Sequence, residues 1–322
     1  MKAAAKVCAN IALIKYWGKV STALNIPAVG SISITLGNLW SETEVEFDES
    51  LPSDTLILDG QSRLDQLGRV TECLDLLRVR AGVEASARVV SHNNFPTGAG
   101  LASSASGLAA LTIAAARALA LELSPRSLSI IARQGSGSAA RSIFGGFVEM
   151  HAGSTPDGSD SFAESLLAAD TWPLEVVIAV TERGEKSVSS RAGMEQSALS
   201  SPYYSDWVAT STVDLDRGRR AVLGRDFEQL TNVAEHSCLK MHAVAMAAQP
   251  PLVYWNATTV ACMHVIWDLR HSGVPVFFTI DAGPQLKAVC APGFSQEVEK
   301  ALRDVPGVLE TLITGLGPGI IG

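Results

Sequence analysis

The sequence is poor in charged and aromatic side chains. Charged residues make up 18% of the 322 positions and aromatic residues 6%, whereas hydrophobic residues reach 47%. This balance excludes a disordered chain, because it provides ample apolar material for a packed core. The formal net charge is -8, so nothing favours nucleic acid as a partner. An anionic small ligand would need a local concentration of positive charge.

Cysteine is scarce and shows no ligand or disulfide spacing. The five cysteines are Cys8, Cys73, Cys238, Cys262 and Cys290. They are scattered and odd in number, so we expect neither a disulfide framework nor a structural zinc site, and a cytoplasmic location fits best. We expect no signal peptide, because Lys15 and Lys19 directly follow the first short apolar stretch.

One uncharged run invites comparison with a membrane span. Residues 93–116 carry no charge, but Pro96, Gly98 and Gly100 interrupt them. This pattern favours a loop that leads into a helix. We therefore expect a protein without a membrane partner.

The length suggests two domains, and no internal repeat is visible. We place the boundary after the polar segment 151–172, which gives domains at 1–172 and 173–322. Strands are expected at 31–36, 43–47, 88–91, 146–150, 174–181, 274–281 and 307–314. Helices are expected at 61–80 (with Gly82 as C-cap), from the end of the 93–106 loop to about 121, and at 127–134, 226–246, 257–271 and 295–304. Because strands and helices mix without strict alternation, the expected fold class is α+β.

The segment at residues 93–106, NNFPTGAGLASSAS, has the composition of an anion-binding loop. Its small residues let backbone N–H groups approach a phosphate, and the following helix would add its positive N-terminal end. It has neither the lysine of a Walker A loop nor the dinucleotide-binding glycine pattern. From composition alone, a flexible glycine loop ahead of a core helix is an equally good interpretation.

Four shorter segments carry further candidate chemistry. Residues 135–141, GSGSAAR, combine hydroxyls, amides and a guanidinium that suit one anion, although such turns are commonly helix caps. Residues 186–194, KSVSSRAGM, repeat the hydroxyl-plus-arginine pattern, which is usual in solvated loops. Residues 9–19, ANIALIKYWGK, place two lysines around an aromatic pair, as a phosphate clamp or as the polar edge of a strand. Residues 277–284, FFTIDAGP, end a strand on Asp281, which caps a turn or acts as a base on a hydroxyl.

A family resemblance emerges when these segments are read together and in order. They contain the runs NIALIKYWGK, NNFPTGAGLASSASG, RQGSGSAARSIFGGF, VSSRAGM and FFTIDAGP, and the stretch 241–251 adds to them. The combination, which spans residues 9 to 284, resembles the mevalonate diphosphate decarboxylases of the GHMP-kinase superfamily. The resemblance implies a two-domain GHMP-kinase fold, with an N-terminal GHMP-type α+β domain, a C-terminal ferredoxin-like domain and an active site between them. It also implies ATP and Mg2+ as cofactors, mevalonate 5-diphosphate as substrate and a homodimer.

The implied reaction begins with transfer of a phosphoryl group from ATP to the tertiary 3-hydroxyl. Loss of phosphate and CO2 then gives isopentenyl diphosphate. This order is chemically sensible, because decarboxylation without an electron-accepting carbonyl or cofactor needs a leaving group on the adjacent carbon. Lys15, Lys19, Arg141 and Arg191 would supply the local positive charge that a chain of net charge -8 must concentrate.

The resemblance also assigns residues one by one. Asp281 matches the aspartate that deprotonates or orients the 3-hydroxyl, Lys15 matches the lysine beside the reacting centre, and Arg141 matches the arginine that holds the substrate carboxylate. The diphosphate and the rest of the substrate would contact Tyr16, Trp17, Lys19, Ser136, Gly137, Ser138, Ser190 and Arg191. The ATP phosphate loop would consist of Asn94, Pro96, Gly98, Ala99, Gly100, Leu101, Ala102, Ser103 and Ser104. Ser103 or Ser104 would lie near Mg2+, and no dedicated carboxylate ligand is evident.

Some positions depart from the family pattern. The stretch 26–31 and Gln285 stand where many relatives have asparagine, and Gln134 stands where arginine is common. Because these positions fall near substrate-contacting loops, a mevalonate 5-phosphate decarboxylase is the nearest alternative. A 3-kinase that does not decarboxylate and a non-catalytic nucleotide or metabolite sensor are the others. The presence of both Lys15 and Asp281 argues against these last two.

Overall fold

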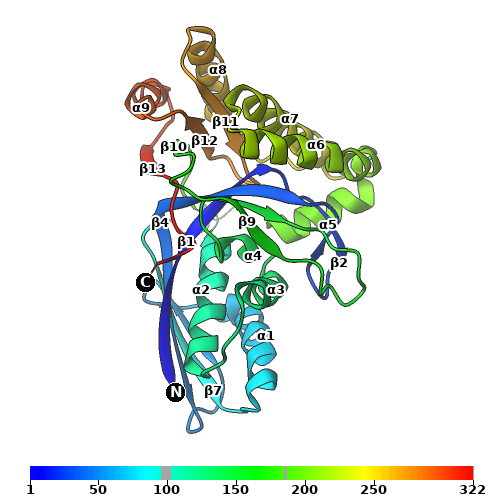
Figure 1. Cartoon of the computed structure of the whole chain (residues 1–322), viewed down its shortest axis with the longest axis vertical. Coiled ribbons are helices and arrows are strands. Elements are labelled where there is room, and N and C mark those ends of the chain that lie inside the picture. The colour runs from blue at the N-terminus through cyan, green and yellow to red at the C-terminus, as the bar shows by residue number, and fades with distance from the viewer. Residues whose placement is uncertain (96–102, 185–186, 322) are drawn as a thin grey trace.

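The computed structural model describes residues 1–95, 103–184 and 187–321, in which two main sheets carry helices on their faces (Figure 1). The strands of the larger sheet are β1 (Lys2–Ile14), β4 (Ser31–Asp48), β5 (Thr55–Leu58), β6 (Gln61–Ser62), β7 (Ser86–Asn93), β8 (Phe147–Met150), β9 (Ala163–Leu167) and β14 (Ile320–Ile321). Their order is β14-β1-β4-β7-β5-β6, while β8 pairs with β4 and β9 pairs with β8. A separate short pair joins β2 (Lys19–Ser21) to β3 (Ile26–Pro27).

Helices of the N-terminal half pack on one face of the larger sheet (Figure 1). They are α1 (Leu64–Ala81), α2 (Ser103–Ala118), α3 (Pro125–Gly135) and α4 (Ala139–Ser142). Leu74 and Leu77 of α1 are buried in the same core as Val89 of β7. Gly82 ends α1 in the left-handed region at φ 65° and donates its N–H to the carbonyl of Arg78. The predicted helix and its cap are confirmed.

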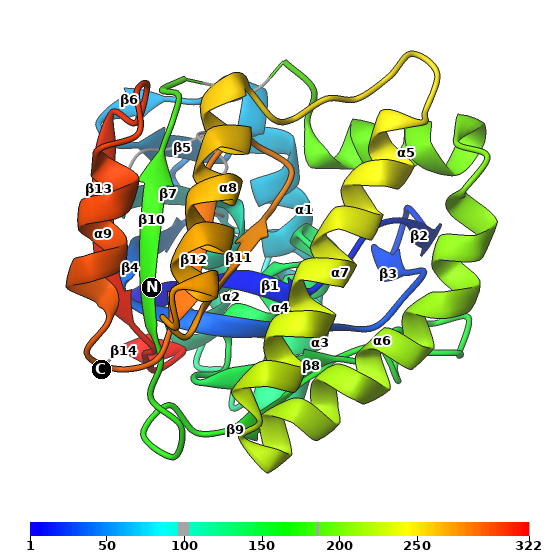
Figure 2. The same cartoon turned by 90° about the horizontal axis from the view of Figure 1, so that it is seen from above.

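The second sheet belongs to the C-terminal half and has the order β11-β12-β10-β13, with every pair antiparallel. Its strands are β10 (Glu175–Val180), β11 (Val276–Ile280), β12 (Leu286–Cys290) and β13 (Glu310–Gly315). The helices are α5 (Ser190–Ser200), α6 (Tyr204–Gly224), α7 (Phe227–Met246), α8 (Ala257–His271) and α9 (Ser295–Arg303). Figure 2 shows α8 and α9 lying over this sheet, with which they share a core. The succession of strand, helices, two strands, helix and strand is that of a ferredoxin-like domain, as expected.

A continuous apolar core joins the two halves. Ile11 of β1 and Ile34 of β4 pack in one cluster with Val176 of β10, Ala234 of α7 and Phe277 of β11. The ends of β1 and β11 are therefore held against each other by buried side chains as well as by hydrogen bonds. A site built from these two strand ends rests on a rigid base.

Several sequence expectations needed correction. The two strands expected at 31–36 and 43–47 are one long strand, β4. No strand was expected at β9 or β12, and no helix at α6. The sequence pattern does not predict α6, because several of its buried positions are polar residues or glycine, among them Ser211, Asp214 and Gly218. The helix therefore lacks an apolar stripe.

The boundary near residue 172 stays a prediction. It falls in the segment between β9 and β10, but the last strand, β14, returns to pair with β1 in the larger sheet.

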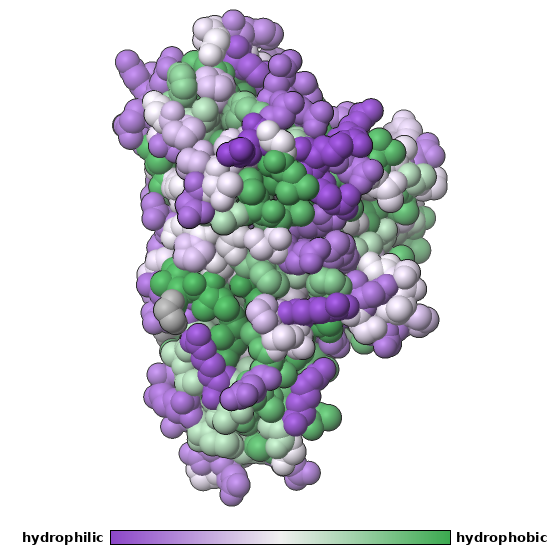
Figure 3. All heavy atoms as spheres, viewed as in Figure 1, coloured by the Kyte–Doolittle hydropathy of each residue, from purple (hydrophilic) through white to green (hydrophobic). Residues whose placement is uncertain are grey.

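Apolar side chains reach the surface among hydrophilic ones, as Figure 3 shows for one face. Within the described ranges of the chain, no helix combines the length and apolar character needed to cross a membrane.

Candidate active site

A cavity of about 680 Å3 lies where the end of β1, the starts of α2, α4 and α5, and the residue after β11 come together. The sequence-predicted residues that line it are Lys15, Tyr16, Trp17, Lys19, Ser103, Ser104, Ser136, Gly137, Ser138, Arg141, Ser190, Arg191 and Asp281. These residues come from five separate segments of the chain. The structure thus brings them around one space.

Three residues of the predicted ATP loop, Asn94, Ser103 and Ser104, lie within the described ranges. Pro96, Gly98, Ala99, Gly100, Leu101 and Ala102 lie outside the described residues. Asn94 is described and is not part of the cavity lining. Its Oδ1 accepts the N–H of Trp40 at 2.7 Å, and its Nδ2 donates to the carbonyl of Asn38 at 2.8 Å. In this structure Asn94 therefore holds the chain against β4.

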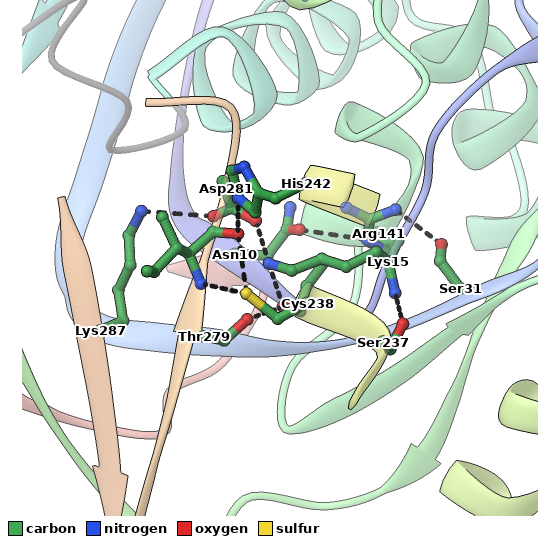
Figure 4. A network of polar contacts seen from close by, with 12 residues as sticks. Asn10, Lys15, Ser31, Arg141, Ser237, Cys238, His242, Thr279, Asp281 and Lys287 are labelled. Carbon is green, nitrogen blue, oxygen red and sulfur yellow. Dashed lines mark hydrogen bonds and ion pairs between the residues drawn. The ribbon is translucent and has the colours of Figure 1, made fainter. Parts of the chain in front are cut away.

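Asp281 stands between two buried lysines (Figure 4). Lys15, directly after β1, places its Nζ 2.7 Å from Oδ1 of Asp281. Lys287, on β12, places its Nζ 3.4 Å from Oδ2. The lysine side chains are 2% and 1% exposed, whereas that of Asp281 is 26% exposed and reaches the cavity. The carboxylate is thus held from both sides and still faces the open space.

The surrounding charges determine the protonation state of Asp281. Burial opposes ionisation, but the ammonium groups of Lys15 and Lys287 and the guanidinium of Arg141 outweigh it and hold the pKa of Asp281 well below its usual range. Burial lowers the pKa of Lys287, and the nearby Asp281 carboxylate opposes this shift. At neutral pH the cavity therefore presents an ionised carboxylate among cations.

Helix α7 holds the backbone on both sides of this contact (Figure 4). The Oγ of Ser237 accepts the backbone N–H of Lys15 at 2.9 Å, and the Sγ of Cys238 accepts the N–H of Ile280 at 3.2 Å. The Nε2 of His242 lies 3.2 Å from the carbonyl oxygen of Ile280. Burial and the charge of Lys15 lower the pKa of His242 to about 3, so a neutral ring donates to that carbonyl. Residues one helical turn apart on α7 thus fix the peptide that precedes Asp281.

Arg141 is buried beside the carboxylate. Its Nε donates to Oδ1 of Asn10 at 3.2 Å and one of its terminal nitrogens donates to Oγ of Ser31 at 2.9 Å. Asn10 is itself fixed, since its Nδ2 donates to Oγ of Ser142 at 2.7 Å. Burial lowers the pKa of Arg141 to about 10, and the group therefore keeps its charge at neutral pH. The result is a cation with a defined orientation at the cavity wall.

A second cationic region lines another part of the cavity. The Nζ of Lys19 donates to Oδ1 of Asn25 at 2.6 Å, and Arg191 lies at the start of α5. Burial and the charge of Arg191 lower the pKa of Lys19 to about 8. A second cation close enough to lower the pKa of Lys19 gives this part of the cavity a positive potential, which favours an anionic ligand.

Tyr16 and Gly137 approach each other closely beside these cations. A Cβ at Gly137 would lie 2.7 Å from the Tyr16 hydroxyl oxygen, so the close approach requires glycine. Within the part of the chain that the structure describes, the buried Tyr16 hydroxyl has no hydrogen-bond partner. An unpaired buried hydroxyl is costly, and a ligand oxygen in the cavity would satisfy it.

The remaining wall suits a nucleotide. Ser103 and Ser104 begin α2, where the helix dipole favours phosphate. The same cavity has apolar lining from Leu56, Leu58, Val70, Val89, Leu108 and Leu111. Hydroxyl oxygens suit Mg2+ when nucleotide phosphates supply other ligands. In residues 1–95, 103–184 and 187–321, no three or more His, Cys, Asp or Glu side chains group as a metal site.

Sequence reasoning missed several residues of the site. Asn10, Asn25, Arg69 and Lys287 received no role, although the first three line the cavity and Lys287 contacts Asp281. Asn10 lies within the NIALIKYWGK run, so its place in a matched segment was an available signal. A lysine inside the strand LKAVC gives no such signal.

The departures from the family pattern can now be placed. Gln285 is fully buried and does not line the cavity. Its Oε1 accepts the N–H of Thr181 at 2.6 Å and its Nε2 donates to the carbonyl of Glu182 at 2.7 Å. Gln134 also does not line the cavity, and its carbonyl accepts a hydrogen bond from Asn25. Their side chains therefore do not contact the space that would hold a substrate.

Comparisons with known sequences agree with this geometry. Residues 7–163 match the diphosphomevalonate decarboxylase-like N-terminal domain, and residues 176–307 match the mevalonate 5-diphosphate decarboxylase C-terminal domain. The diphosphomevalonate decarboxylase of Candida albicans is 37% identical over 290 residues, which cover 85% of this chain and 80% of the relative. That of Saccharomyces cerevisiae is 35% identical over 294 residues, which cover 85% and 74%.

Solved structures similar to this chain are also mevalonate diphosphate decarboxylases. MDDEF in complex with MVAPP, AMPPCP and magnesium superposes with a TM-score of 0.92 at 38% identity, covering 100% of this chain and 98% of the other. Mevalonate diphosphate decarboxylase from Staphylococcus aureus gives a TM-score of 0.93 at 36% identity, covering 99% and 97%. These matches confirm the expected mixed α+β fold of the GHMP-kinase type. The chain belongs to the diphosphomevalonate decarboxylase family.

Proposed function

We propose that this protein uses ATP and Mg2+ to convert mevalonate 5-diphosphate to isopentenyl diphosphate, ADP, phosphate and CO2. The observation that carries the proposal is the ionised Asp281, held by Lys15 and next to Arg141 on the wall of one cavity. Family membership and the MVAPP, AMPPCP and magnesium bound to a close structural relative support the same substrate and cofactors.

The cavity offers separate cations for the two anionic ends of the substrate. Lys19 and Arg191, with the hydroxyls of Ser136 and Ser138, hold the diphosphate. Arg141 binds the carboxylate. Hydrogen bonds with Asn10 and Ser31 already orient its guanidinium for this contact. The 3-hydroxyl then lies between these anchors and faces Asp281.

Asp281 orients the 3-hydroxyl and accepts its proton during phosphoryl transfer. A carboxylate with a depressed pKa is a weak base, but this is sufficient, since the transition state of phosphoryl transfer is loose and the hydroxyl proton becomes acidic late. Lys15 neutralises charge that develops on the transferred group. Ser103 and Ser104 would hold the nucleotide phosphates and Mg2+, and the metal ion would neutralise phosphate charge.

The second half of the reaction is an elimination. The phosphate leaves C3 with the electron pair of the C–O bond. The electrons of the C1–C2 bond become the C2–C3 double bond as CO2 departs. Arg141 keeps the carboxylate aligned for this fragmentation, and the buried cations stabilise the departing phosphate.

The first experiment measures ADP and CO2 released by purified protein with ATP and Mg2+, and compares mevalonate 5-diphosphate, mevalonate 5-phosphate and mevalonate. Equal amounts of ADP and CO2 with the diphosphate are expected. A preference for the monophosphate would keep the mechanism and change the substrate. ADP without CO2 would identify a 3-kinase, and no turnover would favour a sensor.

We also infer a cytoplasmic homodimer. The family resemblance supports this assembly, and side chains such as Leu199 and Val253 leave apolar surface exposed. Light scattering coupled to size-exclusion chromatography tests it. A mass of about 34 kDa, the 33.9 kDa of one chain, would contradict the dimer.

A further inference from the structure

Lys287 is a buried cation with a fixed position next to the reacting centre. It lies on β12, a central strand that pairs with β10 and with β11. In that register Lys287 is opposite Thr279 on β11, two residues before Asp281. Its side chain is 1% exposed and does not line the cavity. It therefore contacts Asp281 from within the protein, whereas Asp281 itself lines the cavity.

We propose that Lys287 is a positioning residue of the reaction, which holds Oδ2 of Asp281 while Lys15 holds Oδ1, so that the carboxylate keeps one orientation toward the reacting hydroxyl (Figure 4). This inference rests on the proposed function, because it assigns Lys287 an effect that passes through Asp281. The two ammonium groups occupy one oxygen each. A carboxylate has about four acceptor directions, so others remain for a substrate hydroxyl.

The alternative is that Lys287 only balances charge in the core. The other groups that face Asp281 are Arg141 from α4, and Cys238 and His242 from α7. Burial raises the pKa of the Cys238 thiol and lowers that of His242, so neither supplies a charge at neutral pH. Arg141 acts on Asp281 through its charge, and its hydrogen bonds go to Asn10 and Ser31. Among the residues described, Lys287 is therefore the cation that contacts Oδ2, and its loss leaves that oxygen free to rotate away.

Rigid strand pairing makes this arrangement suited to positioning. Both Asp281 and Lys287 sit at or beside paired strands β11 and β12, and Thr279 on β11 donates to the carbonyl of Ala12 at 2.9 Å. Because the Lys287 side chain is also 1% exposed, its head group has little freedom to follow a moving carboxylate. Small misplacement of a reacting group can reduce turnover by about 100-fold.

The test compares wild type, Lys287→Gln, Lys287→Met, Lys287→Arg, Asp281→Asn and the Asp281→Asn/Lys287→Gln double variant. Lys300→Gln, at an exposed position of α9, is the matched control. Circular dichroism and thermal melting identify variants that fold, and Lys287→Met supplies a neutral residue without a polar head if Lys287→Gln does not. ADP and CO2 release give kcat and KM from pH 9 down to the lowest pH at which the wild-type protein stays folded.

For a positioning role, the neutral variants lose about 100-fold in kcat. Their KM for mevalonate 5-diphosphate stays within about threefold of wild type, because the diphosphate and carboxylate anchors are intact. The acid limb of the pH profile moves to higher pH, since a cation that lowered the pKa of Asp281 is gone. Lys287→Arg recovers part of the loss. In the Asp281→Asn background the second change adds less than about twofold.

A folded neutral variant with wild-type kcat and an unshifted pH profile would overturn the role of Lys287. A full additional loss in the Asp281→Asn background would also overturn it, because Lys287 would then act independently of Asp281. Failure of the wild-type protein to release CO2 would instead refute the proposed function.

Discussion

The Nζ of Lys15 lies 2.7 Å from Oδ1 of Asp281, although the two residues are 266 positions apart in the chain. Lys15 follows the first strand of the larger sheet, and Asp281 follows β11 in the second sheet. Neither sheet alone contains both groups. The reacting centre is therefore a product of the packing between the two halves, which the shared core and the Ser237 and Thr279 hydrogen bonds stabilise.

Asp281→Asn removes the charge of the carboxylate with little change in shape. We expect turnover to fall by about 100- to 10,000-fold, because an amide cannot accept the hydroxyl proton. ATP binding should be largely intact, since Ser103 and Ser104 lie on another part of the wall. ADP and CO2 release and nucleotide binding are the measurements, with Asp304→Asn at an exposed position as the control. A near-normal rate in the folded variant would remove Asp281 from the mechanism.

Arg141→Lys tests the carboxylate clamp. Lysine keeps a positive charge but cannot bond Asn10, Ser31 and a substrate carboxylate together in a planar fork. We expect kcat/KM to fall by at least about 100-fold. The conservative change Arg303→Lys, on the exposed part of α9, should have no effect. Unchanged KM and kcat in Arg141→Lys would contradict the assigned role.

The lowered pKa of Lys19 predicts that substrate binding weakens as the pH rises. Its pKa in the free protein is lowered to about 8, so the ammonium is present below that pH and is lost as the pH rises through it. We expect kcat/KM for the diphosphate substrate to decline by about tenfold per pH unit above pH 8. Arginine stays charged throughout this range, so Lys19→Arg should remove the decline even if its absolute rate is lower. A decline that persists unchanged in Lys19→Arg would assign it to another group.

Much of the fold was readable from local patterns. The spacing of apolar residues in α1 and the glycine after its last residue predict that helix, and the apolar run at β10 predicts that strand. By contrast, α6 was hidden because Asp214 is buried on it and pairs with Lys240 of α7. Such a tertiary ion pair replaces the apolar stripe on which sequence reasoning depends.

The site likewise contains residues that the sequence predicts and one that it does not. Lys15, Arg141 and Asp281 were predicted from runs of residues similar to a known family, and the structure brings these three together. Lys287 was not predictable, because its importance comes from strand register: β12 places it against β11, whose end carries Asp281. Local sequence does not show which strand will lie beside another.

Gly137→Ala tests the close approach of the phosphate-binding turn to Tyr16. The added methyl group would lie 2.7 Å from the Tyr16 hydroxyl oxygen and 2.9 Å from two ring carbons, so the ring or the turn must move. Because Ser136, Ser138 and Tyr16 all line the cavity, we expect the KM for mevalonate 5-diphosphate to rise by about tenfold or more. The KM for ATP should change less, since the nucleotide wall is formed by other residues. Steady-state kinetics with each substrate varied in turn is the measurement.

Gly224→Ala is the matched control for this substitution. A Cβ there would meet no atom within 4 Å, and the residue ends α6, where alanine is the better helix former. We expect unchanged kinetics and a melting temperature equal to or above that of wild type. If Gly137→Ala also keeps both KM values, the turn tolerates a methyl group and does not form the diphosphate pocket. A rise confined to the diphosphate substrate would instead locate that pocket between Tyr16 and the 136–138 turn, because the three atoms nearest to the added carbon all belong to Tyr16.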